Sequence, residues 1–268
     1  MSAIIKNHNK CHQVSYVTFQ ITLVLLLITT CSLNAKQTEF VETDSLIAQS
    51  TKKKFDTGQY PQEEITRAET LLFLDNHLSK IKSSKQLNYS IRSAGILAKD
   101  SSDVIKVFLE FKKKIVSANA VLSSGRNVSY LNIVKFPQNN PIILYFLERD
   151  ILEMQRLTKG QPNYFRKRIR AALAEGPKIK KLKKTFNGKT INALSFSIKP
   201  YSTDPLRNSP GRAKYKRYSK KLYTFTLSDE VPGHVLEIIT NIPTKNKEKT
   251  YLKEVLVFSD SKNMWKRT

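Results

Sequence analysis

Cysteine is almost absent from this sequence. The 268 residues hold two cysteines, Cys11 and Cys31, and both lie in the first 35 residues. If that segment is removed, no thiol remains for a disulfide, a cysteine metal site or a thiol nucleophile. Histidine is scarce as well, because only His77 and His234 lie beyond residue 35, and no His/Asp/Glu spacing suggests a zinc site. We therefore expect neither a metal nor another cofactor.

Glycine is rare too, and the known phosphate-binding loops require it. The chain has 8 glycines, and none of them falls in a GxGxxG or GxxxxGK pattern. Ser228, Asp229 and His234 are residue types of a catalytic triad, but they lie in one short stretch, where an ordinary turn is the expected structure. We predict that the protein is not an enzyme.

Basic residues outnumber acidic ones. The sequence holds 46 Lys and Arg against 22 Asp and Glu, which gives a formal net charge of +24. An excess of this size favours an anionic partner, such as nucleic acid, an acidic glycan or a membrane surface.

The first 35 residues indicate which of these anionic partners the protein can meet. A positive start (Lys6 and Lys10) precedes the apolar run 21–28, and Ala35 offers a small residue for cleavage. This order predicts a signal peptide over residues 1–35, since the run is short for a transmembrane span. Cys31 leaves a second interpretation open, a lipoprotein-processing site. Export predicts a periplasmic protein, with membrane association left open, and argues against nucleic acid as a partner.

Two helices are predicted at 141–158 and 162–175, in the middle of the chain. Each combines an apolar stripe at helical spacing with charged residues on another side. Beneath a helical lid, the stripes would line a site for a lipid or acyl chain: Ile143, Leu147, Ile151, Met154, Phe165 and Ile169. The opposite side of the second helix would meet an anionic partner: Arg166, Lys167, Arg168 and Arg170. The alternative interpretation is a pair of core helices with a solvated basic side.

The first helix also carries three carboxylates, Glu148, Asp150 and Glu153. They could serve acid–base chemistry, but Arg149 and Arg156 lie beside them. We therefore expect ion pairs on an exposed helix face.

Alternation of apolar and polar residues predicts strands on both sides of these helices. The predicted strands are 86–94, 105–111, 114–122, 128–136, 178–186, 190–198, 220–227, 234–242 and 251–258. Asn187-Gly188 predicts a two-residue hairpin turn, and a further helix is expected at 61–82. The fold class is α+β: a curved, half-barrel-like antiparallel sheet of eight or nine strands, with a leading helix and two helices inserted midway.

The predicted domain organisation follows from these elements. A flexible leader at 36–60 precedes a single domain at 61–260, whose helical insertion spans 141–175, and a tail follows at 261–268. Residues 199–216 form an irregular basic stretch with several prolines. In and after it, cations interleave with tyrosines and suit phosphate or sugar acids, although a solvated loop explains them equally well: Arg212, Lys214, Lys216, Arg217, Lys220 and Lys221.

Three short segments of the sequence resemble those of a known protein family. They are NPIILYFLERDI at 140–151, YFRKRIR at 164–170 and LSDEVPG at 227–233. Through them the chain resembles a family of exported bacterial proteins to which no activity or catalytic residue is assigned. By the order of its elements it is also similar to the outer-membrane lipoprotein carrier (LolA-like) group, which implies a lipid-holding half-barrel with a lid.

Two functions therefore remain open. The first is an exported periplasmic binding protein that holds a lipid or acyl chain under the helical lid. The second is a structural or interaction protein that docks on an anionic envelope polymer or membrane surface. The sequence does not fix the ligand or the oligomeric state.

Overall fold

The computed structural model describes residues 64–98, 101–124, 127–130, 133–205, 213–244 and 249–264. These residues lie in one compact unit that spans Gln59–Thr268. The predicted signal peptide (1–35) and leader (36–60) lie outside the described residues.

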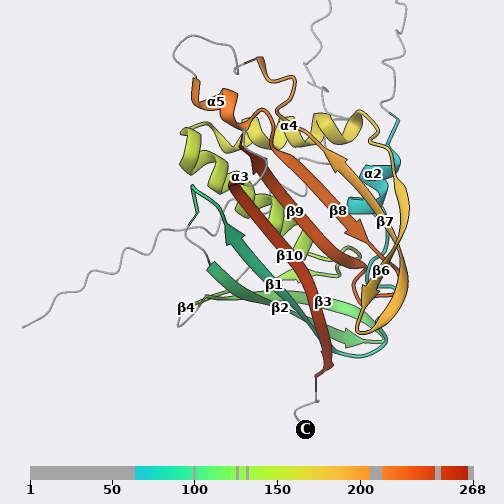
Figure 1. The fold of residues 1–268 in the computed structure, drawn as a ribbon. Coiled ribbons are helices and arrows are strands. Elements are labelled where there is room, and N and C mark those ends of the chain that lie inside the picture. The colour runs from blue at the N-terminus through green and yellow to red at the C-terminus, as the bar shows by residue number, and fades with distance from the viewer. Residues whose placement is uncertain are drawn as a thin grey trace, which may run out of the picture. The chain divides into compact units, whose positions relative to one another are not determined.

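A single antiparallel sheet, open and curved, carries the fold (Figure 1). Its strands are β1 (Lys85–Ala94), β2 (Ser101–Lys112), β3 (Lys114–Ser124), β4 (Asn127–Tyr130), β5 (Val134–Lys135), β6 (Lys180–Phe186), β7 (Lys189–Ile198), β8 (Leu222–Leu227), β9 (Val235–Pro243) and β10 (Thr250–Asn263). They follow the order β4-β3-β2-β1-β10-β9-β8-β7-β6, and β5 pairs with β3 beside β4. Among the described strands, no pairing joins the two ends of this order. The predicted α+β class with a curved antiparallel sheet is confirmed.

The two halves of the chain meet in the middle of the sheet. β1 precedes the central helices and β10 ends the described chain, yet they pair from Lys85 opposite Asn263 to Ala94 opposite Lys253. The last strand was predicted for 251–258, but it runs to Asn263 because this partner is available along its whole length. The pairing makes one continuous sheet from segments far apart in sequence.

The alternation of apolar and polar residues correctly predicted which face of the sheet is buried. In β2, Ile105, Val107 and Leu109 are fully buried, whereas Lys106 between them is exposed. Burial of such a side chain contributes about 1.5–3 kcal/mol. The predicted hairpin turn also forms, with Asn187 at φ 48° and Gly188 at φ 73°, both in the left-handed region that a type I′ turn requires.

The central helices are α3 (Ile142–Thr158) and α4 (Pro162–Ala174), close to their predicted bounds. Figure 1 shows both on the same side of the sheet. Glycine is the usual residue to end a helix in the left-handed conformation, but α3 ends with Lys159 at φ 57°, and Gly160 follows it. Gly160 has another role, since a Cβ there would lie 2.7 Å from the Phe165 ring and 2.8 Å from the Tyr215 hydroxyl. Its missing side chain permits this close packing.

The leading helix is shorter than predicted. α2 (Arg67–Glu69) opens with a capping box between Thr66 and Glu69 and continues as the π-helix η1 (Thr70–Leu74). The helical pattern predicted to residue 82 was wrong beyond Leu74. Leu78 and Ile81, which extended that pattern, reach the core from an irregular segment instead.

Three other segments also differ from the prediction. The strand expected at 128–136 is divided into β4 and β5. Part of the stretch expected to be irregular, 199–216, forms the short helix α5 (Ala213–Tyr218). The strand expected from residue 220 begins at Leu222. The preceding residue, Lys221, is buried in the core, where its ammonium group donates a hydrogen bond to Asp150.

Candidate functional site

The six apolar residues predicted to line a ligand site lie in the hydrophobic core. Each is at most 5% exposed, and all belong to one cluster with the buried face of the sheet: Ile143, Leu147, Ile151, Met154, Phe165 and Ile169. Phe165, for example, meets the ring of Tyr201 edge-on at a centroid distance of 6.0 Å. These side chains therefore stabilise the packing of α3 and α4, and their contact with a ligand stays a prediction.

The four cations predicted to face an anionic partner divide into two pairs. Lys167 and Arg170 are exposed. Arg166 instead forms a bidentate pair with Glu148 of α3, at 2.8 and 2.6 Å. Arg168 donates to the carbonyl of Pro200 and to the hydroxyl of Thr203. Two of the four predicted contacts thus hold α4 to its neighbours, which a pattern of charges along one helix cannot reveal.

The second predicted basic cluster is described only in part. Lys216 and Arg217 are exposed on α5, and the Arg217 guanidinium lies 4.9 Å from the centre of the Tyr251 ring. Lys214 belongs to α5, but its side chain lies outside the described part, as does Arg212 altogether. The prediction was wrong for Lys221, which is fully buried and pairs with Asp150.

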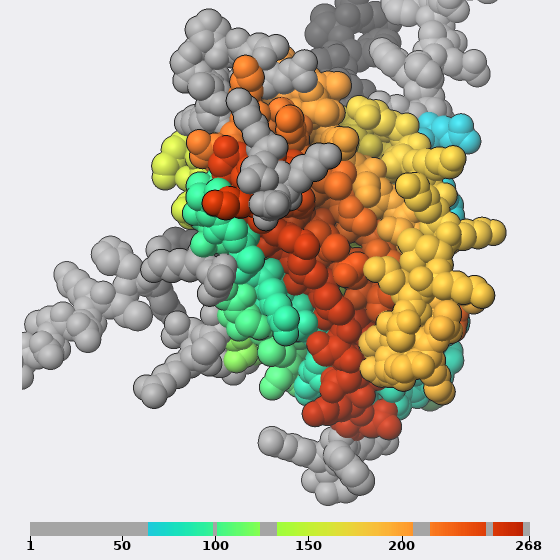
Figure 2. Space-filling view, viewed as in Figure 1, coloured from blue at the N-terminus to red at the C-terminus, as the bar shows by residue number. Residues whose placement is uncertain are grey.

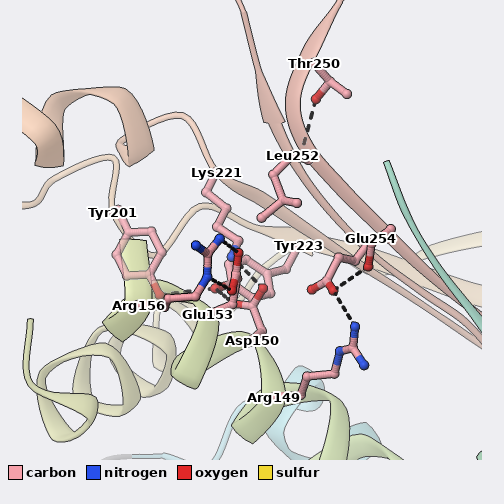
Figure 3. Close-up of polar contacts among 11 residues, drawn as sticks. Arg149, Asp150, Glu153, Arg156, Tyr201, Lys221, Tyr223, Thr250, Leu252 and Glu254 are labelled. Atoms are coloured by element: carbon pink, nitrogen blue, oxygen red, sulfur yellow. Dashed lines mark hydrogen bonds and ion pairs between the residues drawn. The ribbon is translucent and has the colours of Figure 1, made fainter. Parts of the chain in front are cut away.

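A buried ion pair lies between α3 and the sheet (Figure 3). Asp150 and Lys221 are both fully buried, and the Lys221 ammonium donates to Asp150 Oδ1 at 2.5 Å. The Tyr223 hydroxyl donates to Asp150 Oδ2 at 2.5 Å and lies 3.1 Å from the hydroxyl of Tyr201. Burial, and next the charge of Asp150, raises the pKa of Tyr223 well above its ordinary value, so the phenol keeps its proton.

This arrangement corrects the prediction that all three carboxylates of α3 lie on an exposed face. Glu153 pairs with Arg156 at the surface, as expected. Asp150, however, falls on the helical row of Phe146, Leu147 and Met154 that faces the core. It requires a charged partner because an isolated buried carboxylate is costly.

A second polar group continues across the sheet from this pair. Arg149 contacts Glu254 of β10 at 3.2 Å and Asp103 of β2 at 3.9 Å. Ser93 of β1 donates to the same oxygen, Glu254 Oε1. Glu254 Oε2 and the hydroxyl of Thr240, its cross-strand partner on β9, are buried, and neither has a hydrogen-bond partner among the described residues. We call Ser93, Asp103, Arg149, Asp150, Lys221, Tyr223 and Glu254 the polar seam; it joins α3 to four strands of the sheet, β1, β2, β8 and β10, and to Lys221 just before β8.

The two histidines, distant in sequence, are neighbours in the fold. The rings of His77 and His234 are 5.8 Å apart. The backbone N–H of Asn140 donates to His77 Nδ1, so Nε2 carries the proton and donates to the carbonyl of Leu71 at 2.8 Å. Among the described residues, no group of three or more His, Cys, Asp or Glu could hold a metal ion.

A hollow of about 420 Å³ opens at the end of the sheet where β2 turns into β3. Three segments form it: the irregular segment after η1, the β2–β3 turn and the chain between β5 and α3. Its lining, which we call the end pocket, consists of Asn76, Leu78, Ser79, Ile81, Lys82, Phe111, Lys113, Lys114, Ile115, Phe136, Pro137 and Gln138.

Two features distinguish the end pocket from an ordinary surface depression. Lys113 at φ 63° and Phe136 at φ 47° both adopt the left-handed conformation, which costs energy for residues other than glycine. Three large apolar side chains in or just before one of its segments are also exposed: Ile133 is 64%, Val134 41% and Phe136 61% exposed, and Phe136 belongs to the lining. The Lys114 ammonium lies 5.2 Å from the centre of the Phe136 ring.

The sequence did not predict the end pocket. Its three segments carry no shared motif, and they come together only because the predicted leading helix ends at Leu74 and the predicted fourth strand is broken. The only available signal was the run Lys112-Lys113-Lys114, which interrupts the alternation between two strands.

Comparisons with known proteins add little. No family model matches the chain, and no curated protein matches it. Among solved structures, a LolA superfamily protein from Nitrosomonas europaea matches 74% of this chain and 94% of its own, with 14% sequence identity and a TM-score of 0.22. A TM-score this low carries no argument about shared function. The resemblance to an exported bacterial family therefore stays a prediction. In the described part of the chain, no helix has the length and apolarity needed to cross a membrane.

Proposed function

We propose that this is an exported binding protein that holds an acyl chain or another apolar group in the end pocket. The observation that carries the proposal is the meeting of Leu78, Ile81, Phe111, Ile115 and Phe136 around an open hollow of about 420 Å³. This volume lies within the range of about 300–1,000 Å³ that is usual for small-molecule sites.

The surroundings of the end pocket support this choice. Large exposed apolar side chains in a group mark contacts with lipids or partners more often than single ones do. Ile133, Val134 and Phe136 are three such side chains within four residues of the sequence.

The end pocket suits the ligand better than the space beneath the central helices. The predicted lining there is already packed in the core, so an acyl chain would have to displace several buried side chains. Each displacement costs about 1.5–3 kcal/mol. The end pocket also has buried lining residues (Leu78, Ile81 and Ile115), but there a hollow is already open beside them, and Phe136 is exposed.

The proposal also includes a cellular location and a class of partner. The N-terminal pattern supports export to the periplasm, and the positive charge supports work near an anionic lipid or envelope component rather than nucleic acid. None of the site residues described above belongs to a catalytic arrangement, so we propose binding without chemistry.

Native mass spectrometry tests the proposal directly. Protein purified without detergent should retain an apolar ligand, which delipidation removes, and an acyl-chain fluorescent probe should then bind. Phe136→Asn should weaken probe binding while keeping the fold, because asparagine tolerates φ 47° but lacks the apolar ring. Leu152→Asn, on an equally exposed leucine of α3, serves as the matched control and should bind normally. Absence of both retained ligand and probe binding would reject the function.

A second candidate function, docking on an anionic surface, is supported by the exposed lysines of β6. β6 is an edge strand, and its lysines Lys180, Lys181 and Lys183 are exposed; Figure 2 shows side chains of the yellow segment that includes β6 projecting from the edge of the sheet. These cations could dock the protein on an anionic membrane or envelope polymer. Lysines on an edge strand also prevent unwanted strand pairing, so docking requires its own test. Binding to anionic but not to zwitterionic vesicles, lost in Lys180→Gln/Lys181→Gln/Lys183→Gln, would support it.

A further inference from the structure

We propose that the ligand of the end pocket is an anionic amphiphile, whose charged head group binds Lys82, Lys113 and Lys114 while its chain enters the hollow. This inference rests on the proposed function, since it requires that an apolar chain binds there. It adds the chemical class of the ligand and the residues that select it.

The three lysines converge from two separate segments. Lys82 lies in the irregular segment between η1 and β1, Lys113 forms the turn between β2 and β3, and Lys114 begins β3. All three line the same hollow as Ile81 and Ile115. Cations and apolar side chains therefore meet within one site. A ligand with a single anionic end and an apolar chain satisfies both parts of this lining, whereas a neutral lipid or a small inorganic anion satisfies only one.

The conformation of Lys113 points the same way. It is the single residue between Lys112 and Lys114, which pair with each other across the turn, and it adopts φ 63°. Glycine or asparagine would adopt this conformation more readily. A lysine held in a strained turn beside a hollow is the kind of exception that accompanies a functional contact.

The charges of these lysines are not neutralised within the described part of the chain. Lys112 next to them pairs with Glu110 at 2.8 Å, but no ion pair is formed by Lys82, Lys113 or Lys114. The Lys82 ammonium donates to the neutral carbonyl of Ser79, and that of Lys114 lies over the Phe136 ring. The end pocket contains no Asp or Glu among its lining residues. Its field therefore favours an anion near the mouth.

Paired ligands of equal chain length test the head group. Delipidated full-length protein is titrated calorimetrically with decanoate, decyl phosphate, decanol and inorganic phosphate at low salt. Decanoate and decyl phosphate should bind about tenfold more tightly than decanol, because up to three exposed cations contribute modestly each. The preference should diminish as salt is added. The comparison between decanoate and decyl phosphate shows which anionic group fits better.

Two triple variants with the same change in charge locate the contact. Lys82→Gln/Lys113→Asn/Lys114→Gln should reduce the preference for decanoate over decanol to less than about threefold, with decanol binding little changed. Lys180→Gln/Lys181→Gln/Lys183→Gln, on β6, should keep the full preference. Circular dichroism checks that both variants fold.

The outcomes separate the inference from the proposed function. Equal binding of decanoate and decanol, or an equal loss in both triple variants, overturns the inference and leaves apolar binding in place. Inorganic phosphate that binds as tightly as decyl phosphate overturns it as well, since the site would then recognise the anion alone. If none of the decyl ligands binds, the proposed function fails, and the inference fails with it.

Discussion

At the scale of single residues, the most unusual feature is the buried ion pair between Lys221 and Asp150. Two opposite charges, both fully buried, join the chain before β8 to α3. A buried pair of this kind does not by itself make a fold more stable, because loss of hydration offsets most of the attraction. Its removal from one side, however, leaves an unpaired charge in the core. Loss of either partner should therefore disfavour the packing of α3 against this segment.

We predict that breaking the pair is costly and that replacing it is not. Asp150→Ala should lower the free energy of unfolding by about 3–5 kcal/mol, because Lys221 then remains charged in an apolar site. Asp150→Leu/Lys221→Met should be within about 1 kcal/mol of the wild type or more stable, since no charge is left. Urea unfolding followed by circular dichroism measures both.

The surface pair of the same helix provides the control. Glu153→Gln removes the exposed ion pair with Arg156 and should change the free energy of unfolding by less than about 0.5 kcal/mol. A cost for Asp150→Ala as small as that of Glu153→Gln would show that Lys221 finds water or another partner, contrary to its burial in the structure.

A second residue-scale prediction concerns His77 and pH. Burial lowers the pKa of His77, and Asp75 opposes this shift in part. The unfolded chain binds a proton near the ordinary pKa of about 6.5, while the folded protein does so only at lower pH. Stability should therefore fall as the pH drops below about 6.5. His234, whose pKa burial also lowers, should contribute in the same direction.

Urea unfolding at pH 7.5, 6.5 and 5.5 checks this dependence. Each histidine can contribute at most about 1.4 kcal/mol per pH unit. His77→Gln should show a lower stability at pH 7.5, because the bonds to Leu71 and Asn140 are altered, but a smaller loss on acidification. A wild type that is equally stable at pH 7.5 and 5.5 would contradict the buried, neutral histidine.

At the scale of elements, several patterns confined to a short stretch predicted the structure correctly, although the leading helix was predicted too long. The alternation in β2 and the Asn187-Gly188 turn depend on neighbouring residues alone, and so do the apolar stripes of α3 and α4. Contacts between distant residues were not predictable. Lys221 and Asp150 are 71 residues apart, and charged residues are expected at the surface unless a partner is known. The end pocket could not be predicted for the same reason, because its lining residues come from three separate segments of the chain.

The basic side of α4 gives a prediction at this scale. Lys167→Glu/Arg170→Glu should leave the free energy of unfolding within about 0.5 kcal/mol of wild type, since both side chains are exposed. Arg166→Glu should destabilise by more than 1 kcal/mol, because it places a second carboxylate against the partly buried Glu148. Thermal unfolding separates the two variants.

The same variants show whether α4 meets a membrane. If it does, Lys167→Glu/Arg170→Glu should weaken co-sedimentation with anionic vesicles, most strongly at low salt. If that variant and the wild type co-sediment equally at low salt, Lys167 and Arg170 are simply solvated, and β6 becomes the remaining candidate for docking.

At the scale of the whole described unit, the sheet order makes the two halves of the chain depend on each other. β1 lies between β2 and β10, so the segment before the helices completes a sheet that the segment after them continues. Neither half can bury its share of the core alone. In β1, Leu87 and Tyr89 are fully buried, and the ring of Tyr89 meets that of Phe258 on β10 at 5.4 Å.

This arrangement predicts one cooperative unit. A protease site inserted after Gly176, in the exposed stretch between α4 and β6, should allow a single cut that leaves the two pieces associated through β1 and β10. The nicked protein should elute as one species and unfold in one transition, because the pairing and core contacts outlast the broken peptide bond. The two pieces expressed separately should lack a cooperative unfolding transition, since each would expose a long unpaired strand and an uncovered apolar face. Size-exclusion chromatography and circular dichroism of the nicked chain and of each piece check these outcomes. A piece that resists further proteolysis and melts cooperatively by itself would show two independent domains, and the continuous sheet would then not be the unit of stability.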